Sequence, residues 1–141
     1  MAEPGRLPEW VLILEDEPDH RLLMRQAISR VAPGVPLVEK AQVDHAREWL
    51  EGMMRQQVSM CEGLVVLDLG LPRASGFDIL EWLRDHVDCN PLPAVVITAS
   101  ENPMDAEHAF QLGARGYFQK PADFLEYMEI FRQILKIGPD E

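Results

Sequence analysis

The stretch that decides the fold lies at residues 64–76 and reads LVVLDLGLPRASG. Four apolar residues run directly into an aspartate, Asp68, which is followed by a glycine, a Leu-Pro pair and a second glycine. A short continuous apolar run is typical of a strand that is buried on both faces of a sheet. Asp, Gly and Pro are ordinary loop residues, so this stretch alone favours Asp68 as a turn residue at the end of a strand.

The same kind of apolar run alternates with helical patterns along the rest of the chain. Further strands are predicted at residues 10–14, 36–40, 94–98 and 116–119, and helices at residues 19–31, 44–57, 77–86, 103–112 and 122–137. This alternation favours a parallel sheet with helices on both faces. We predict an α/β, flavodoxin-like (βα)5 three-layer sandwich with strand order 2-1-3-4-5. It spans residues 10–137, between a disordered tail at residues 1–9 and a C-terminal tail at residues 138–141.

Composition limits the classes of function and of partner. The chain of 141 residues has 24 acidic and 13 basic residues, and its formal net charge of -11 repels nucleic acid and anionic membranes. No signal peptide begins the chain and no apolar run is long enough to cross a membrane, so we expect a soluble, cytoplasmic protein. Cys61 and Cys89 are too few and too widely spaced for a disulfide scaffold or a zinc site, and we expect reduced thiols.

Polar residues follow the predicted strands at the edge where ligands bind in such sheets. Glu15 and Asp16 follow the first strand, and Asp68 follows the third. Thr98 ends the fourth strand, and Lys120 follows the fifth. Each has an ordinary structural reading, such as acids in the first turn of a helix or a lysine at the surface. Their coincidence at one edge favours a site, and three crowded carboxylates favour a cation with a preference for oxygen ligands, such as Mg²⁺.

Four blocks of the sequence resemble, in order, the receiver domain of two-component response regulators. They are LILEDEP, LVVLDLGLPRASG, VVITAS and GARGYFQKP, and the resemblance covers about residues 10–137. It implies that Asp68 is the phosphoacceptor and that the acidic pair binds Mg²⁺, with Asp16 as a direct ligand and Glu15 acting through water. The other positions that the resemblance assigns are the metal-binding backbone of Gly70, the phosphoryl-binding residues Thr98, Ala99 and Lys120, the switch residues Thr98 and Tyr117, and a cis peptide bond between Lys120 and Pro121.

The resemblance also implies a function. Asp68 would accept a phosphoryl group from the phosphohistidine of a sensor histidine kinase, and Thr98 would then move toward it and let Tyr117 turn inward. Only GPDE follows the last predicted helix, so we expect a single-domain regulator that docks on a downstream protein or passes the phosphoryl group to a phosphotransfer protein. It would not be an enzyme, although it catalyses its own phosphorylation and dephosphorylation. A weaker resemblance, carried by KPADFLEYMEIFRQILK and the length, is to stand-alone regulators that partner phytochrome histidine kinases.

Three alternative functions compete with that of a receiver domain. A phosphatase of the haloacid dehalogenase type also uses an aspartate nucleophile after a strand, but it needs a second acid where this chain has Gly70. A flavodoxin-like nucleotide binder needs a phosphate cradle after the first strand, where EDEPD would repel phosphate. A pseudo-receiver, which keeps the fold and binds partners without being phosphorylated, remains open.

The last predicted helix carries more apolar residues than one buried stripe requires. Phe124, Met128, Phe131 and Leu135 share one face, which would lie on the sheet. An adjoining stripe consists of Tyr127, Ile130, Ile134 and Ile137. We predict that this second stripe is exposed and forms a homodimer through the last two helices and the strand between them. The alternative is that a neighbouring helix of the same chain covers it.

Overall fold

The computed structural model describes residues 7–71 and 73–136. Over these residues five strands alternate with five helices. The strands are β1 (Val11–Leu14), β2 (Leu37–Lys40), β3 (Leu64–Leu67), β4 (Ala94–Thr98) and β5 (Gly116–Gln119). The helices are α1 (Pro18–Val31), α2 (Val43–Arg55), α3 (Gly76–His86), α4 (Pro103–Gln111) and α5 (Phe124–Leu135). The predicted tails lie outside the described residues, except for residues 7–9.

The strands form one parallel sheet in the order β2-β1-β3-β4-β5, which confirms the predicted fold class. Every residue of β1, β3 and β4 is buried, whereas the edge strands β2 and β5 are half-buried for most of their length. This difference follows from the sequence, because the three central strands are almost wholly apolar and the edge strands carry charged or polar residues.

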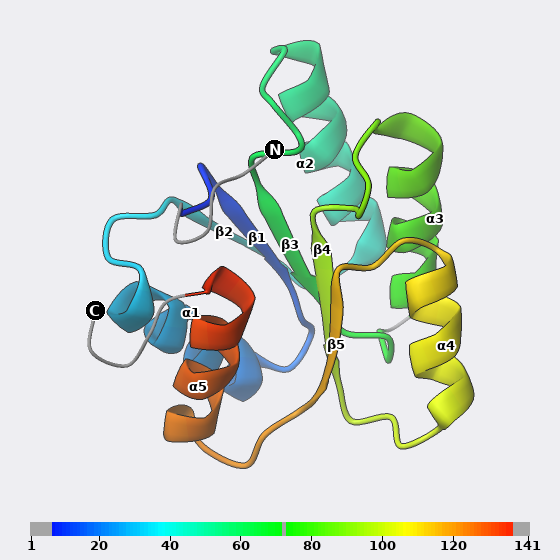
Figure 1. Cartoon of the computed structure of the whole chain (residues 1–141). Helices are drawn as coiled ribbons and strands as arrows, with labels where there is room; N and C mark the ends of the chain where they lie inside the picture. The colour runs from blue at the N-terminus through cyan, green and yellow to red at the C-terminus, as the bar shows by residue number, and fades with distance from the viewer. Residues whose placement is uncertain (1–6, 72, 137–141) are drawn as a thin grey trace.

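Helices cover both faces of the sheet (Figure 1). α1 and α5 lie on one face, and α2, α3 and α4 lie on the other. Residues of each strand alternate between the two cores, as the period of two requires. Val11 and Ile13 pack in the core beneath α1 and α5, while Leu12 and Leu14 pack in the opposite core. None of the helices in the described part of the chain is both long and apolar enough to cross a membrane.

Three of the helices begin at side-chain caps close to the carboxyl ends of the strands. Ser75 caps α3 in a reciprocal capping box with Asp78, and Asn102 caps α4 by accepting a 3.0 Å hydrogen bond from the backbone of Met104. Asp123 caps α5 in the same way. These caps fix where the loops after β3, β4 and β5 end.

The expectation of two reduced thiols is wrong, because Cys61 and Cys89 form a disulfide with Cα atoms 5.7 Å apart. Their separation in the sequence is 28 residues, but the β3–α3–β4 crossover returns the chain to the same end of the sheet. Cys61 lies in the loop before β3 and Cys89 in the loop before β4, and these strands are parallel neighbours. The disulfide therefore joins two loops that the topology has already placed side by side.

The predicted cis peptide bond between Lys120 and Pro121 is also wrong. Among the described residues the cis bond lies between Asn90 and Pro91. An X-Pro bond still prefers the trans form by about 0.5–1 kcal/mol, so its isomer depends on the tertiary surroundings rather than on the dipeptide. Here Lys120 enters the site described below from a trans peptide bond.

The predicted exposed stripe on α5 is covered within the monomer. Tyr127 is fully buried, and Ile130 and Ile134 are half-buried against the core shared with α1. The hydroxyl of Tyr127 lies 2.7 Å from Nδ1 of His20 on α1. Ile137 lies outside the described residues. The neighbouring helix α1 accounts for the second stripe, so the argument for a homodimer through it fails.

Candidate functional site

Three carboxylates meet at the carboxyl ends of β1 and β3. Oxygen atoms of Glu15, Asp16 and Asp68 all lie within 4.8 Å of one another. Glu15 and Asp68 are buried and Asp16 is half-buried. The two strands are parallel neighbours, so residues that follow them directly must converge at this edge. The structure thus brings together the acidic residues that the sequence singled out.

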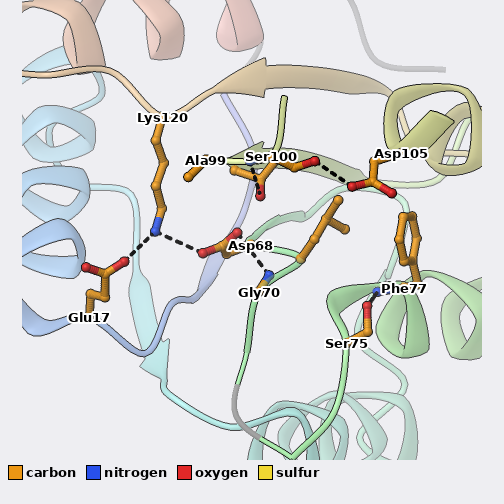
Figure 2. Close-up of a pocket in the computed structure, with 11 residues that line it drawn as sticks. Glu17, Asp68, Gly70, Ser75, Phe77, Ala99, Ser100, Asp105 and Lys120 are labelled. Atoms are coloured by element: carbon orange, nitrogen blue, oxygen red, sulfur yellow. Dashed lines mark hydrogen bonds and ion pairs between the residues drawn. The ribbon is translucent and has the colours of Figure 1, made fainter. Parts of the chain in front are cut away.

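Lys120 enters this acidic cluster from the loop after β5. Its Nζ lies 2.9 Å from Oδ2 of Asp68, and the same distance separates it from Oε1 of Glu15 and from Oε1 of Glu17. Figure 2 shows the lysine pointing down between Glu17 and Asp68. Only 7% of its side chain is exposed. One ammonium group therefore serves three carboxylates in a largely buried position.

The charges at this edge shift the pKa values of the groups around Lys120. Burial favours the neutral form of Lys120, but the carboxylates of Asp68, Glu17 and Glu15 outweigh it and raise the lysine pKa. Burial also opposes ionisation of Asp68, but Lys120 and the Thr98 hydroxyl outweigh it and hold the pKa of Asp68 below its usual range. For Glu15 burial prevails and raises the pKa. Asp68 is thus the buried carboxylate kept ionised by its neighbours.

Thr98 and the loop after β4 form the wall opposite the acidic pair. Thr98 is buried, and its Oγ1 accepts a 3.3 Å hydrogen bond from the backbone of Ser100. The Ser100 hydroxyl donates to Asp105 on α4 at 2.5 Å, and the Gln119 side chain donates to the Ser100 carbonyl. Ala99 is exposed and lines the same pocket. The loop is thereby tied to Thr98, to α4 and to β5.

Two glycines that follow β3, Gly70 and Gly76, approach Asp68 and differ in their surroundings. The backbone N–H of Gly70 donates to Oδ1 of Asp68 at 3.2 Å, and a Cβ at Gly70 would meet no atom within 4 Å. A Cβ at Gly76, in contrast, would overlap the backbone carbonyl of Asp68. Gly76 therefore permits the start of α3 to approach the site, a requirement that the sequence reading did not identify. The metal-binding role of the Gly70 carbonyl stays a prediction.

Tyr117 lies on β5, with its ring partly buried against the core that includes α4. Its hydroxyl is buried and forms no hydrogen bond with any other residue that the structure describes. Burial raises the pKa of this hydroxyl. Its role as a switch stays a prediction.

Sequence reasoning missed two partners of the site. The site predicted from the sequence does not include Glu17, which pairs with Lys120 and lines the pocket. Tyr127 was assigned to an exposed surface, yet its hydroxyl lies close enough to the site for Lys120, Glu15 and Asp68 to act on its pKa, which burial raises. No spacing signal in the sequence identifies either residue, because both contacts join elements more than 100 residues apart.

The donor set fits a divalent cation that prefers oxygen ligands. Glu15, Asp16 and Asp68 offer carboxylate oxygens, and no thiolate or imidazole belongs to this cluster of described residues. Lys120 compensates part of the negative charge, and Asp16 has no ion pair among the described residues. The cluster therefore has the ligand chemistry of a Mg²⁺ or Mn²⁺ site.

Curated proteins similar to this chain include two named bacterial regulators and one uncharacterized protein. A 14.6 kDa protein of Leptolyngbya boryana, named only for its place in the sodA1 3′ region, is 30% identical, covering 92% of this chain and 93% of its own. The polar-differentiation response regulator DivK of Brucella anthropi is 26% identical, with coverages of 92% and 98%. The transcriptional regulatory protein GltR of Pseudomonas aeruginosa is 25% identical over 89% of this chain. This chain spans about half the length of GltR (48%).

Solved structures with the same fold include three response regulators, each 22% identical to this chain. The Mn²⁺-bound form of Rcp1 has a TM-score of 0.76 and covers 93% of this chain and 97% of its own. The phosphorylated cyanobacterial phytochrome response regulator RcpA also has a TM-score of 0.76, with coverages of 90% and 91%. The regulator RPA3017, from red light signalling of R. palustris, has a TM-score of 0.75 and covers 95% of each chain.

The family model of the response regulator receiver domain matches residues 11–132, from β1 into α5. This range contains all five strands and every residue of the acidic site. The chain belongs to the response regulator receiver domain family of two-component systems.

Proposed function

We propose that this protein accepts a phosphoryl group on Asp68 from the phosphohistidine of a sensor histidine kinase. The observation that carries the proposal is the position of Lys120, whose Nζ is 2.9 Å from Oδ2 of Asp68, beside a cluster in which oxygens of Glu15, Asp16 and Asp68 lie within 4.8 Å of one another. An ionised carboxylate flanked by a cation and by further metal-ligand oxygens is the arrangement that phosphoryl transfer requires.

The transfer itself needs little covalent chemistry from the protein. A carboxylate oxygen of Asp68 forms a bond to phosphorus as the bond from phosphorus to the histidine nitrogen breaks, which leaves an acyl phosphate and a free imidazole. Lys120 donates a hydrogen bond to one phosphoryl oxygen, and the Thr98 hydroxyl and the backbone N–H of Ala99 donate to the others. Glu15, Asp16, Asp68 and the carbonyl of Gly70 would hold Mg²⁺, which supplies compensation of the negative charge on the phosphoryl oxygens.

The signal would leave the site through Thr98. Its Oγ1 accepts the hydrogen bond of the Ser100 backbone, so moving the hydroxyl toward a phosphoryl group gives up a contact that holds the loop before α4. Tyr117 would follow into the space that Thr98 leaves. The surface formed by α4, β5 and α5 would then change for a downstream protein or a phosphotransfer protein, as a two-state element biased by one local charge.

The similar proteins support a more specific proposal about the partner kinase and the type of regulator. RcpA is a cyanobacterial phytochrome response regulator and RPA3017 belongs to red light signalling, which supports a kinase of the phytochrome type as the partner. DivK and the Leptolyngbya boryana protein, both matched over nearly their whole length, support a regulator consisting of one receiver domain. A cytoplasmic location stays a prediction, and a disulfide is unusual for that compartment.

The proposal is tested by incubating the protein with acetyl phosphate and Mg²⁺ and measuring its intact mass. We expect the mass of one phosphoryl group to be added to the wild type and not to Asp68→Asn. A wild type that stays unmodified with acetyl phosphate and with its kinase would overturn the proposal and favour the pseudo-receiver. Equal labelling of Asp68→Asn would move the phosphoacceptor to another residue.

The roles of the acidic pair are tested separately by titration with Mg²⁺. Asp16 is half-buried and free of Lys120, whereas Glu15 is buried and paired with it. We therefore expect Asp16→Asn to weaken Mg²⁺ binding more than Glu15→Gln does, as measured by calorimetry. The reverse ranking would make Glu15 the direct ligand.

A further inference from the structure

Glu17 differs from the other two carboxylates that contact Lys120. Glu15 and Asp68 have buried side chains, with 0% and 6% exposed, whereas 58% of the Glu17 side chain is exposed. Glu17 is also absent from the group of carboxylates whose oxygens converge as cation ligands. It is thus a partner of the lysine and not a member of the metal-ligand cluster.

The position of Glu17 at the start of α1 leaves its side chain available for this contact. Glu17 is the N-cap residue of α1, but its side chain makes no capping hydrogen bond, and Pro18 occupies the first turn. Its backbone N–H donates to Oε2 of Glu15 at 3.0 Å, and Arg21 donates to the carbonyl of Glu15 at 2.8 Å. The backbone is therefore held while the carboxylate reaches out to Lys120 at 2.9 Å.

An ammonium group has three N–H donors, and in this structure three carboxylates lie at donor distance from Nζ of Lys120. A phosphoryl group on Asp68 would need at least one of these donors. Glu17 is the partner that can be released at the smallest cost, because its carboxylate is already largely hydrated. Its charge also lies on the wall of the pocket, where it would repel an incoming phosphoryl group.

We propose that Glu17 is a positioning residue that holds Lys120 in the unphosphorylated protein and competes with the phosphoryl group for its ammonium. This inference rests on the proposed function of Asp68. Glu17 restrains activation: the pair with Lys120 forms in the resting state and must break, or at least weaken, when a phosphoryl group arrives. A chain without this carboxylate binds phosphoryl groups more readily.

The test compares Glu17→Gln with Asp19→Asn in the full chain. Asp19 is the matched control, because it is an exposed acid in the first turn of α1 that has no ion pair with any described residue and does not line the pocket. The probe is beryllofluoride with Mg²⁺, a stable mimic of the phosphoryl group, titrated by calorimetry. We expect Glu17→Gln to bind it about fivefold more tightly than the wild type, the size typical of one exposed ion pair. Asp19→Asn should change binding by less than about twofold, because its exposed charge forms no ion pair with Lys120 and is screened by solvent.

A second measurement detects the pair without any phosphoryl mimic. The ammonium resonance of Lys120, observed by ¹⁵N NMR in the absence of Mg²⁺, should shift in Glu17→Gln and stay unchanged in Asp19→Asn. Equal affinity of Glu17→Gln and wild type for beryllofluoride, or equal effects of the two substitutions, would overturn this inference alone. A wild type that does not bind beryllofluoride at all would overturn the proposed function and this inference with it.

Discussion

The two ends of the sheet are built from the same strands but have opposite chemistry. At the carboxyl end lie the buried polar side chains of the described residues, Glu15, Asp68 and Thr98, together with the nearly buried Lys120. At the amino end Trp10 packs edge-on against Trp49. The carboxyl end therefore carries crowded charged side chains, whereas the amino end carries packed aromatic rings and the Cys61–Cys89 disulfide.

The amino end is organised around Trp10 and the loops before β3 and β4. A Cβ at Gly63 would overlap the Trp10 ring, so glycine lets the loop pass directly over the indole. The indole N–H donates to the carbonyl of Ser59 at 3.4 Å, and the disulfide closes the same region. Changes at the amino end should therefore alter stability without altering metal binding, whereas changes at the carboxyl end should alter both.

The largest effect is expected for Lys120→Met at the carboxyl end. Removing the lysine leaves Glu15 and Asp68 buried without a cation, which should lower the free energy of unfolding by about 4 kcal/mol in the presence of a chelator. Saturating Mg²⁺ should recover part of this loss, because it replaces the missing positive charge. Urea denaturation with chelator and with Mg²⁺ measures both quantities. Lys40→Met on the edge strand is the control. An equally small effect of both substitutions would show that the buried carboxylates of Glu15 and Asp68 do not need the lysine for stability.

A slightly smaller loss of stability is expected when the disulfide is removed. Replacing both cysteines, Cys61→Ser with Cys89→Ser, should lower the free energy of unfolding by about 3 kcal/mol, because the crosslink restricts the unfolded chain. The affinity for Mg²⁺ should stay within about twofold of wild type, since a crosslink that restricts the unfolded chain leaves the folded site unchanged. Reductant should destabilise the wild type and leave the double variant unchanged. A large change in Mg²⁺ affinity would contradict the expectation that changes at the amino end leave the metal site unaffected.

The smallest effect is expected for Tyr127→Phe, whose hydroxyl lies near the carboxyl-end site and contacts α1. The substitution removes the hydroxyl that contacts His20 at 2.7 Å and should cost about 1 kcal/mol of stability. Tyr117→Phe is the matched control, because its buried hydroxyl has no hydrogen bond with the described residues and its loss should cost less. Denaturation of the two variants side by side checks the ranking. Equal costs would mean that the His20 contact adds nothing to stability.

The sequence predicted the parts of the molecule that follow from strand order. Once the strands are parallel and ordered 2-1-3-4-5, the residues after β1, β3, β4 and β5 must meet, and Asp68 and Lys120 do so at 2.9 Å. Contacts made by residues away from the strand ends could not be predicted in this way. The Cys61–Cys89 disulfide depends on how two loops return, and the pairing of Glu17 with Lys120 depends on a side chain that leaves its helix cap.

The α5 stripe shows a different limit of sequence reasoning. Counting apolar residues identified a second apolar stripe on α5, but the prediction that this stripe is exposed was wrong. α1 covers it, and a polar contact that no hydrophobic pattern reveals, between His20 and Tyr127, joins the two helices. Helix pairs that pack on the same face of a sheet therefore have to be considered together before a surface is called exposed.

Locating the phosphoryl group on the chain tests directly whether Asp68 is the phosphoacceptor. Treating the phosphorylated protein with borohydride reduces an aspartyl phosphate to homoserine, which peptide mass spectrometry can locate in the chain. We predict that Asp68 alone is converted to homoserine, and only when Mg²⁺ is present during phosphorylation. Conversion at another carboxylate, or a modified chain with an unaltered Asp68, would contradict it.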